Sequence, residues 1–170
     1  VRHYSLPAFD SGARAERVAA SSVMSNKVAL ERPAILVSRL NPRFNRTWWV
    51  EPEPEKPAFA SPEFAMLQAS DRRSLADVWL AVRDETFREK LIHRAMGTSG
   101  SHQRIRPGDM LAIEVPDTRL ASGDVLDGAL LLLDRIESQR RETEALINVR
   151  NALLPELLSD RIRVPIEEAS

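Results

Sequence analysis

Two clusters of basic, amide and hydroxyl side chains offer the binding chemistry of this sequence. The first contains Lys27, Ser38, Arg39, Asn41, Arg43, Asn45 and Arg46, and Trp48 and Trp49 follow it. The second contains Thr98, Ser99, Ser101, His102, Gln103, Arg104 and Arg106. Arginine and lysine hydrogen-bond to guanine, asparagine and glutamine to adenine, and serine or threonine to either, while the remaining cations hold phosphates. The clusters therefore predict a nucleic-acid interface; the alternative for each single residue is a solvated surface side chain.

The distribution of charge favours the same reading. Residues 1–106 hold 17 Lys and Arg against 12 Asp and Glu, a balance of +5, whereas residues 107–170 hold 7 against 13, a balance of −6. Phosphate backbones attract the first kind of surface and repel the second. The sequence thus predicts two parts with different tasks, with chance clustering of surface charge as the alternative.

The sequence lacks the motifs of common catalytic sites. Residues 41–44 (NPRF) resemble the N-P-P-[FY] signature of amino-methylating DNA methyltransferases, but Arg43 replaces the second proline and no G-x-G loop for a methyl donor occurs. There is no G-K-[ST] phosphate loop, the three histidines are scattered, and there are no cysteines. We therefore expect no catalytic residue, no metal and no cofactor. A methyltransferase fragment remains a minor alternative.

The secondary-structure elements around the clusters must hold them in place. The sequence of residues 2–69 predicts mainly strands. Residues 2–9 are expected to be extended and to end at the turn of residues 10–12. Residues 34–40 predict a buried strand, residues 47–50 its returning partner, and residues 63–69 a third strand or a short helix after Ser61-Pro62. Trp48 and Trp49 are expected in the core. The connector of residues 51–57 (EPEPEKP) is expected to be stiff, with Glu51, Glu53 and Glu55 solvated.

Two helices are predicted after the strands. The first starts at Ser74 and has Leu75, Val78, Trp79 and Val82 on one face. The second covers residues 85–96, with Phe87, Leu91 and Ile92 inward and Gly97 ending it. Residues 110–115 predict a strand or a short helical turn.

A long helix is predicted from residue 125 to about residue 158. Its apolar stripe, spaced by three and four, contains Ala129, Leu132, Ile136, Gln139, Thr143, Leu146, Arg150, Leu153 and Leu157, with Gln139 and Arg150 as polar interruptions. About 30 residues span roughly 45 Å, more than the diameter of the preceding domain. We therefore expect another chain to cover part of the stripe; the alternative is an amphipathic helix lying on its own domain. Pro155 is expected to kink or end the last turn.

Six strings of residues, taken in order, resemble the specificity subunit of bacterial Type I restriction–modification systems. They are YSLPAFD (4–10), SNK (25–27), ILVSRLNPR (35–43), SPEF (61–64), GTSGSHQRI (97–105) and LLPELLSDRIRV (153–164). The last string has Asp160 where the family most often has glycine. Each string alone is a weak signal, but their order and spacing cover nearly the whole chain.

The resemblance implies an α+β fold with three parts. Residues 1–122 would form a target recognition domain that reads one half of a split site in double-stranded DNA. Residues 123–160 would form a long coiled-coil helix that pairs antiparallel with the helix of a second copy or repeat, and residues 161–170 a tail. Because a full specificity subunit has two domains and two helices, this chain is expected to be a half-size subunit that forms a homodimer, or a C-terminal half.

The resemblance also implies partners. DNA methyltransferase subunits would dock on the chain, a nuclease–translocase subunit could join, and catalysis would belong to these partners. The absence of cysteines, of a membrane span and of a visible signal peptide favours the cytoplasm of a bacterium or archaeon. The alternative function is an α/β oligomerisation or protein-interaction module without DNA binding.

Overall fold

The computed structural model describes residues 1–22, 26–95, 103–118, 123–159 and 161. It confirms the α+β fold with a long C-terminal helix. The chain divides into two compact units, Val1–Leu130 and Leu131–Ser170. None of the helices in the described residues has both the length and the apolar character that crossing a bilayer requires.

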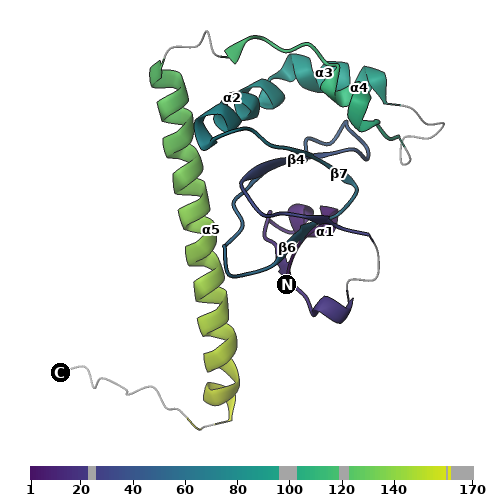
Figure 1. Cartoon of the computed structure of the whole chain (residues 1–170). Helices are drawn as coiled ribbons and strands as arrows, with labels where there is room; N and C mark the ends of the chain where they lie inside the picture. The colour runs from purple at the N-terminus through teal and green to yellow at the C-terminus, as the bar shows by residue number, and fades with distance from the viewer. Residues whose placement is uncertain (23–25, 96–102, 119–122, 160, 162–170) are drawn as a thin grey trace. The chain divides into compact units, whose positions relative to one another are not determined.

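A three-stranded antiparallel sheet lies at the centre of the first unit, in the order β5-β4-β7 (Figure 1). Its strands are β4 (Ala34–Ser38), β5 (Thr47–Val50) and β7 (Phe64–Leu67). All five side chains of β4 are buried, as expected for a central strand with both faces covered. The three predicted strands are confirmed, and the short helix considered after Ser61-Pro62 is not formed.

A second sheet has the order β2-β1-β6-β3. It consists of β1 (Arg2–Tyr4), β2 (Glu16–Arg17), β6 (Ala58–Ala60) and β3 (Val28–Ala29), with β1 and β6 parallel. The prediction of an extended segment over residues 2–9 is wrong after residue 4, where α1 (Leu6–Asp10) begins. The Ser5 hydroxyl accepts a hydrogen bond of 3.1 Å from the amide of Ala8, so a capped turn replaces the strand.

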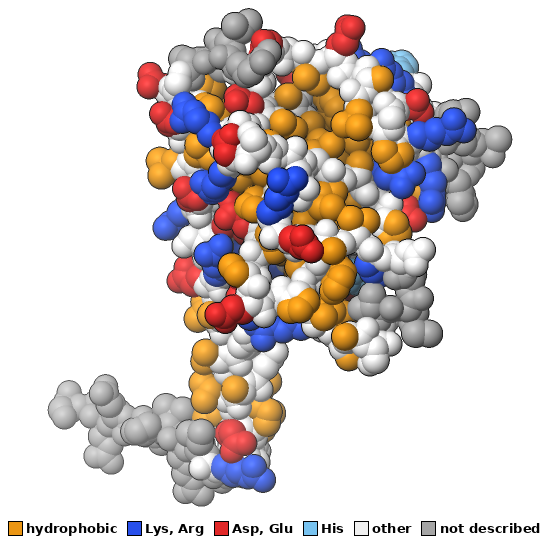
Figure 2. Space-filling model, viewed as in Figure 1, with side chains coloured by type: hydrophobic (Ala, Val, Ile, Leu, Met, Phe, Trp, Pro, Cys, Tyr) orange, Lys and Arg blue, Asp and Glu red, His pale blue; other side chains and the backbone are white. Residues whose placement is uncertain are grey.

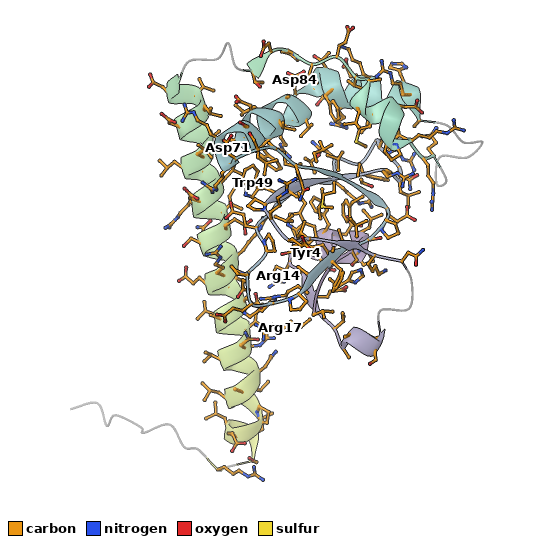
Figure 3. The ribbon with its side chains drawn as sticks, in the orientation of Figure 1. Tyr4, Arg14, Arg17, Trp49, Asp71 and Asp84 are labelled. Atoms are coloured by element: carbon orange, nitrogen blue, oxygen red, sulfur yellow. The ribbon has the colours of Figure 1, made fainter. Side chains whose placement is uncertain are left out.

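The two adjacent tryptophans of β5 are buried, as predicted, and connect the layers of the first unit. Side chains alternate along a strand, so Trp48 meets Tyr4 and Phe9 on one face, at ring-centroid distances of 5.0 and 5.6 Å. Trp49 meets Trp79 of α2 on the other face, at 6.0 Å. Figure 3 shows Trp49 below α2 and Tyr4 on the side of the second sheet. The central sheet is therefore covered by helices on one face and by the second sheet on the other.

Three helices follow the strands: α2 (Arg72–Arg83), α3 (Glu85–Arg94) and α4 (Pro107–Leu111). Helix α2 begins before the predicted Ser74 because Asp71 caps it and accepts from the amide of Ser74 at 2.9 Å. This bond is the main cause that lowers the pKa of Asp71 to about 2. Asp84 separates α2 from α3 (Figure 3). Both predicted helices are confirmed, although α3 ends at Arg94, and Gly97 lies outside the described residues.

Residues 110–115 contain only the end of α4, so the helical-turn alternative is the one observed and the strand is not formed. The prediction for the connector of residues 51–57 is wrong in part. Glu51 accepts hydrogen bonds from the indole of Trp49 at 2.8 Å and from Arg72 at 2.9 Å. Glu53 pairs with Arg2 at 2.9 Å, whereas Glu55 is exposed. The first two glutamates therefore tie the connector to the core.

The long helix α5 (Gly123–Leu158) contains 36 residues, roughly 54 Å at the α-helical rise. It begins two residues before the predicted start. Pro155 lies inside its last turn and does not end it, contrary to one of the two outcomes considered. The stripe predicted from the sequence is exposed at its large apolar members, among them Leu146 at 63% and Leu153 at 43%.

Candidate nucleic-acid interface

The structure brings described members of the two predicted clusters together at one end of the central sheet. Residues 39–41, which follow β4, run antiparallel beside residues 103–105, with Leu40 and Arg104 as the paired residues. Two backbone hydrogen bonds of 2.8 and 3.0 Å connect these segments. We call the paired segments the clasp. Side chains about 60 positions apart in the sequence therefore share one surface.

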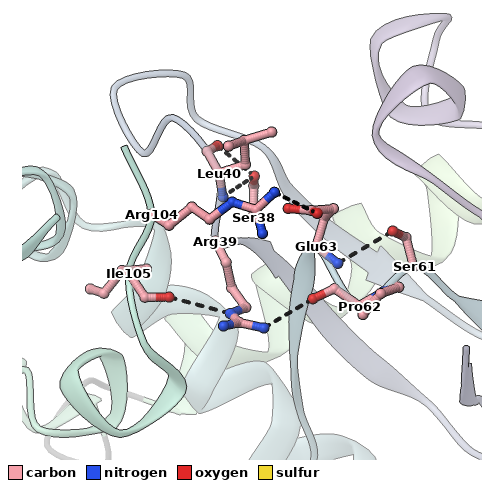
Figure 4. A network of polar contacts seen from close by, with 8 residues as sticks. All are labelled: Ser38, Arg39, Leu40, Ser61, Pro62, Glu63, Arg104 and Ile105. Atoms are coloured by element: carbon pink, nitrogen blue, oxygen red, sulfur yellow. Dashed lines mark hydrogen bonds and ion pairs between the residues drawn. The ribbon is translucent and has the colours of Figure 1, made fainter. Parts of the chain in front are cut away.

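Arg39 holds the clasp together. Its Nε donates to the carbonyl of Ile105 at 3.2 Å, and its Nη1 donates to the carbonyl of Pro62 at 3.1 Å. Figure 4 shows its guanidinium group between these two carbonyls. Hydrogen bonds from a charged donor are stronger than neutral ones. Because the charge of Arg39 is used to join three segments, we assign it to positioning the surface.

Ser38 serves the fold in the same region. Its side chain is buried, its hydroxyl donates to the carbonyl of Leu40 at 2.8 Å, and the same oxygen accepts from the amide of Leu40 at 3.2 Å. A hydroxyl with both functions used internally and only 2% of the residue exposed cannot read a base. The predicted role of Ser38 in nucleic-acid binding does not fit this environment.

The loop after the clasp presents an aromatic ring between cations. Asn41 opens the loop with a φ of +49°, a conformation that asparagine tolerates better than most residues. Phe44 is 49% exposed, and the guanidinium carbons of Arg43 and Arg46 each lie 5.0 Å from the centre of its ring. Such distances are typical of cation–π contacts. In the major groove of duplex DNA an exposed aromatic ring can contact a thymine methyl group while adjacent cations hold phosphates.

The two arginines of this loop differ in the exposure of their side chains and in their hydrogen-bond partners. Arg46 donates to both carboxylate oxygens of Asp10, at 2.8 and 2.9 Å, and its side chain is only 17% exposed. Arg43 is exposed, and its carbonyl accepts a hydrogen bond of 3.3 Å from Arg88 of α3. We therefore expect Arg43 to reach a ligand directly and Arg46 to stabilise the loop.

The second cluster adds further exposed cations. The side chain of Arg104 is 59% exposed and forms a 2.9 Å ion pair with Glu63 (Figure 4). Arg106 is exposed immediately before α4, and Gln103 is half-buried. An exposed ion pair such as that of Arg104 is worth little, so a phosphate can replace Glu63 as its partner.

The remaining predicted residues are placed differently. Lys27 lies near the second sheet, where its charge adds to the larger effect of burial in lowering the pKa of His3. Asn45 is exposed, and its side-chain oxygen accepts from the hydroxyl of Thr47 at 2.9 Å. Ser99, Ser101 and His102, with Thr98, lie outside the described residues.

Two members of this surface, Phe44 and Arg88, do not belong to the predicted clusters. Phe44 was considered only as part of the methyltransferase-like tetrapeptide, and Arg88 belongs to a helix whose sequence predicts only a solvated polar face. An aromatic residue between two arginines was an available signal for Phe44. No local pattern could place Arg88 beside a loop 45 positions earlier.

Comparison with protein-family models, with curated proteins and with solved structures finds no match to this chain.

Proposed function

We propose that this chain is a non-catalytic module for sequence-specific recognition of double-stranded DNA. In this proposal the surface around the clasp reads one half of a split target, and α5 pairs with the helix of a second copy. The module directs partner methyltransferase subunits, and a nuclease subunit where one is present, to the site. Methyl transfer and cleavage take place in those partners.

The observation that carries the proposal is the meeting of described members of both clusters at the clasp. Arg43, Arg104 and Arg106 are exposed there, beside the half-exposed ring of Phe44. The surface rests on a buried strand and is fixed by Arg39, so its side chains start from defined positions. Rigid strands that support polar loops are a frequent arrangement of binding sites. The resemblance of six sequence strings to Type I specificity subunits supports the same function.

Salt-dependent binding to duplex DNA tests the proposal. Each phosphate neutralised contributes about −0.9 to the slope of log K against log salt concentration, so three exposed arginines predict a slope of about −3. The full chain should be titrated into a labelled random-sequence duplex over a range of salt concentrations. Selection of duplexes from a random pool should then yield a consensus. A binding constant that does not change with salt would reject the proposal.

A protein-interaction module without DNA binding remains the second candidate because of the exposed stripe of α5. It predicts that the chain self-associates but shows no affinity for DNA that depends on salt. Methylation profiling of cells with and without the chain, alongside the methyltransferase, separates the candidates in vivo. Only the DNA-recognition module changes which sites are methylated.

A further inference from the structure

The edge of β7 borders an apolar groove in the first unit, and the larger part of this groove lies outside the clasp. We propose that this groove binds an extended segment of a partner protein by strand addition. The segment has apolar side chains at alternate positions and a lysine or arginine near one end. This inference does not depend on DNA binding.

The groove consists of two connected hollows. The larger, of about 720 Å³, is lined by the end of β7, one side of α2, and residues 110–118. The smaller, of about 360 Å³, follows the rest of β7 toward Arg39. Both hollows share Met66, Leu67, Met110 and Leu111 in their walls, so they form one path along the strand. Figure 2 shows apolar side chains gathered and hollowed on this face, over β7, α2 and α4.

The backbone of β7 offers hydrogen bonds to a ligand. β7 is an edge strand that pairs with β4 alone. The carbonyl of Glu63 accepts from Arg39 on the β4 side, so the backbone groups of Phe64 and Met66 point the other way. In the described part of the chain, the amide and carbonyl of Met66 have no backbone partner on that outer side. Such an edge can pair with another extended chain.

The apolar rim indicates that the groove is normally covered. Leu111 is 72% exposed and Val115 is 40% exposed, and both line the larger hollow. Val28 is 40% exposed beside the smaller one. Contiguous apolar surface that borders a concave site usually marks an interaction surface. The alternate apolar side chains of an added strand point to one face and would fill the larger hollow beside α2, while the strand's backbone pairs with β7.

The carboxylates of the larger hollow indicate that the bound segment has a basic side chain at the end that lies there. Among the described residues, the wall of the larger hollow contains two carboxylates, Asp77 and Asp117, and no lysine or arginine. The Oδ1 atom of Asp77 is buried without a hydrogen-bond partner among the described residues. A basic side chain at this end would compensate that charge. The carboxylate of Asp77 would also repel a phosphate, which favours a peptide over nucleic acid in the larger hollow.

Peptides of matched composition test the inference on the full chain. The probe is a labelled library that alternates Val, Ile or Leu with Ser or Thr and has lysine near one end. Two matched libraries carry glutamate in place of lysine, or N-methyl groups on alternate backbone amides. We expect the lysine library to bind about tenfold more tightly than the glutamate library, and the N-methylated library to lose binding. Equal binding of the lysine and glutamate libraries, or equal binding of the N-methylated library, would overturn the inference.

Two variants locate the binding in the groove. Leu111→Asp should remove peptide binding, and Asp77→Asn should remove the preference for lysine over glutamate. Val125→Asp changes an apolar residue that is 53% exposed and outside the groove walls, and should leave peptide binding unchanged. Thermal unfolding of each variant verifies that it is folded. Unchanged peptide binding in folded Leu111→Asp would overturn the inference. DNA binding should be measured on the same variant, so that a failure of the groove proposal can be told apart from a failure of the proposed DNA recognition.

Discussion

Two arginines of the clasp region have the same chemistry but different surroundings. Arg39 donates to two backbone carbonyls from segments 23 and 66 positions away. Arg104 is more exposed and has a single carboxylate partner. Water can replace the partner of Arg104 more easily than those of Arg39. Arg39 should therefore contribute more to the stability of the fold, and Arg104 more to binding.

Arg39→Ala should lower the free energy of unfolding by about 2 kcal/mol, because two charged hydrogen bonds are lost and their carbonyls lose a partner. Arg104→Ala is the matched control and should lower it by less than about 1 kcal/mol. Urea unfolding of both variants measures the difference. Equal losses in the two variants would mean that Arg39 does not hold the clasp.

Arg43→Ala and Arg104→Ala should each weaken binding to duplex DNA. Replacing a residue that reads a base should lower the binding free energy by roughly 1–3 kcal/mol and relax the sequence preference at one position. Replacing a residue that contacts only phosphate should instead reduce the slope of log K against log salt concentration by about one. Arg32→Ala is the control, because Arg32 is exposed near the opposite end of β4. Binding of all three variants to selected and scrambled duplexes provides the comparison. Identical behaviour of Arg43→Ala, Arg104→Ala and the parent chain would remove the clasp from the DNA interface.

At the scale of the element, the start of α2 depends on a charged cap. The pKa of Asp71 is about 2 in the folded chain and 3.8 in the ordinary reference state, chiefly because the amide of Ser74 donates to it. The cap therefore stabilises the fold fully above about pH 4, and this contribution is lost as the pH falls toward 2.

Asp71→Asn should make stability less dependent on pH in that interval. Asparagine is also a good N-cap residue, so the helix should remain while the titrating group is removed. Circular dichroism during urea unfolding at several pH values measures the slopes. Asp84 caps α3 and its pKa is also lowered, so some acid sensitivity should remain in the variant. Identical slopes for variant and parent would contradict the assignment.

Elements with a strong local pattern could be predicted from the sequence, and those defined by distant partners could not. The aliphatic run of β4 and the apolar face of α2 can be recognised from the local sequence alone. Strands β2 and β3 contain two residues each and exist only through pairing with β1 and β6. The polar clusters were also visible in the sequence, but the backbone pairing of residues 39–41 with residues 103–105 was not. Whether a cluster member can contact a ligand depends on its burial, which the sequence does not show; Ser38, for example, is buried.

At the scale of the whole molecule, the exposed stripe of α5 predicts self-association. Leu146→Asp combined with Leu153→Asp should abolish it, because both substitutions place a charge in the stripe that a partner helix would bury. Sedimentation measurements on the full chain report the mass. Asn148→Asp, at an exposed position outside the stripe, should associate as the parent does. A parent chain that stays monomeric at high concentration would reject this prediction.

The clasp also has a consequence for inheritance by recombination. Its halves are encoded about 60 codons apart, and each half supplies backbone hydrogen bonds to the other. A crossover between related genes that falls between positions 41 and 103 would join a loop from one parent to a strand partner from the other. Chimeras that exchange both segments together should retain a working surface, whereas those that exchange only one should not. Under the proposed function, a new DNA specificity would therefore be acquired by exchange of both halves of the clasp together.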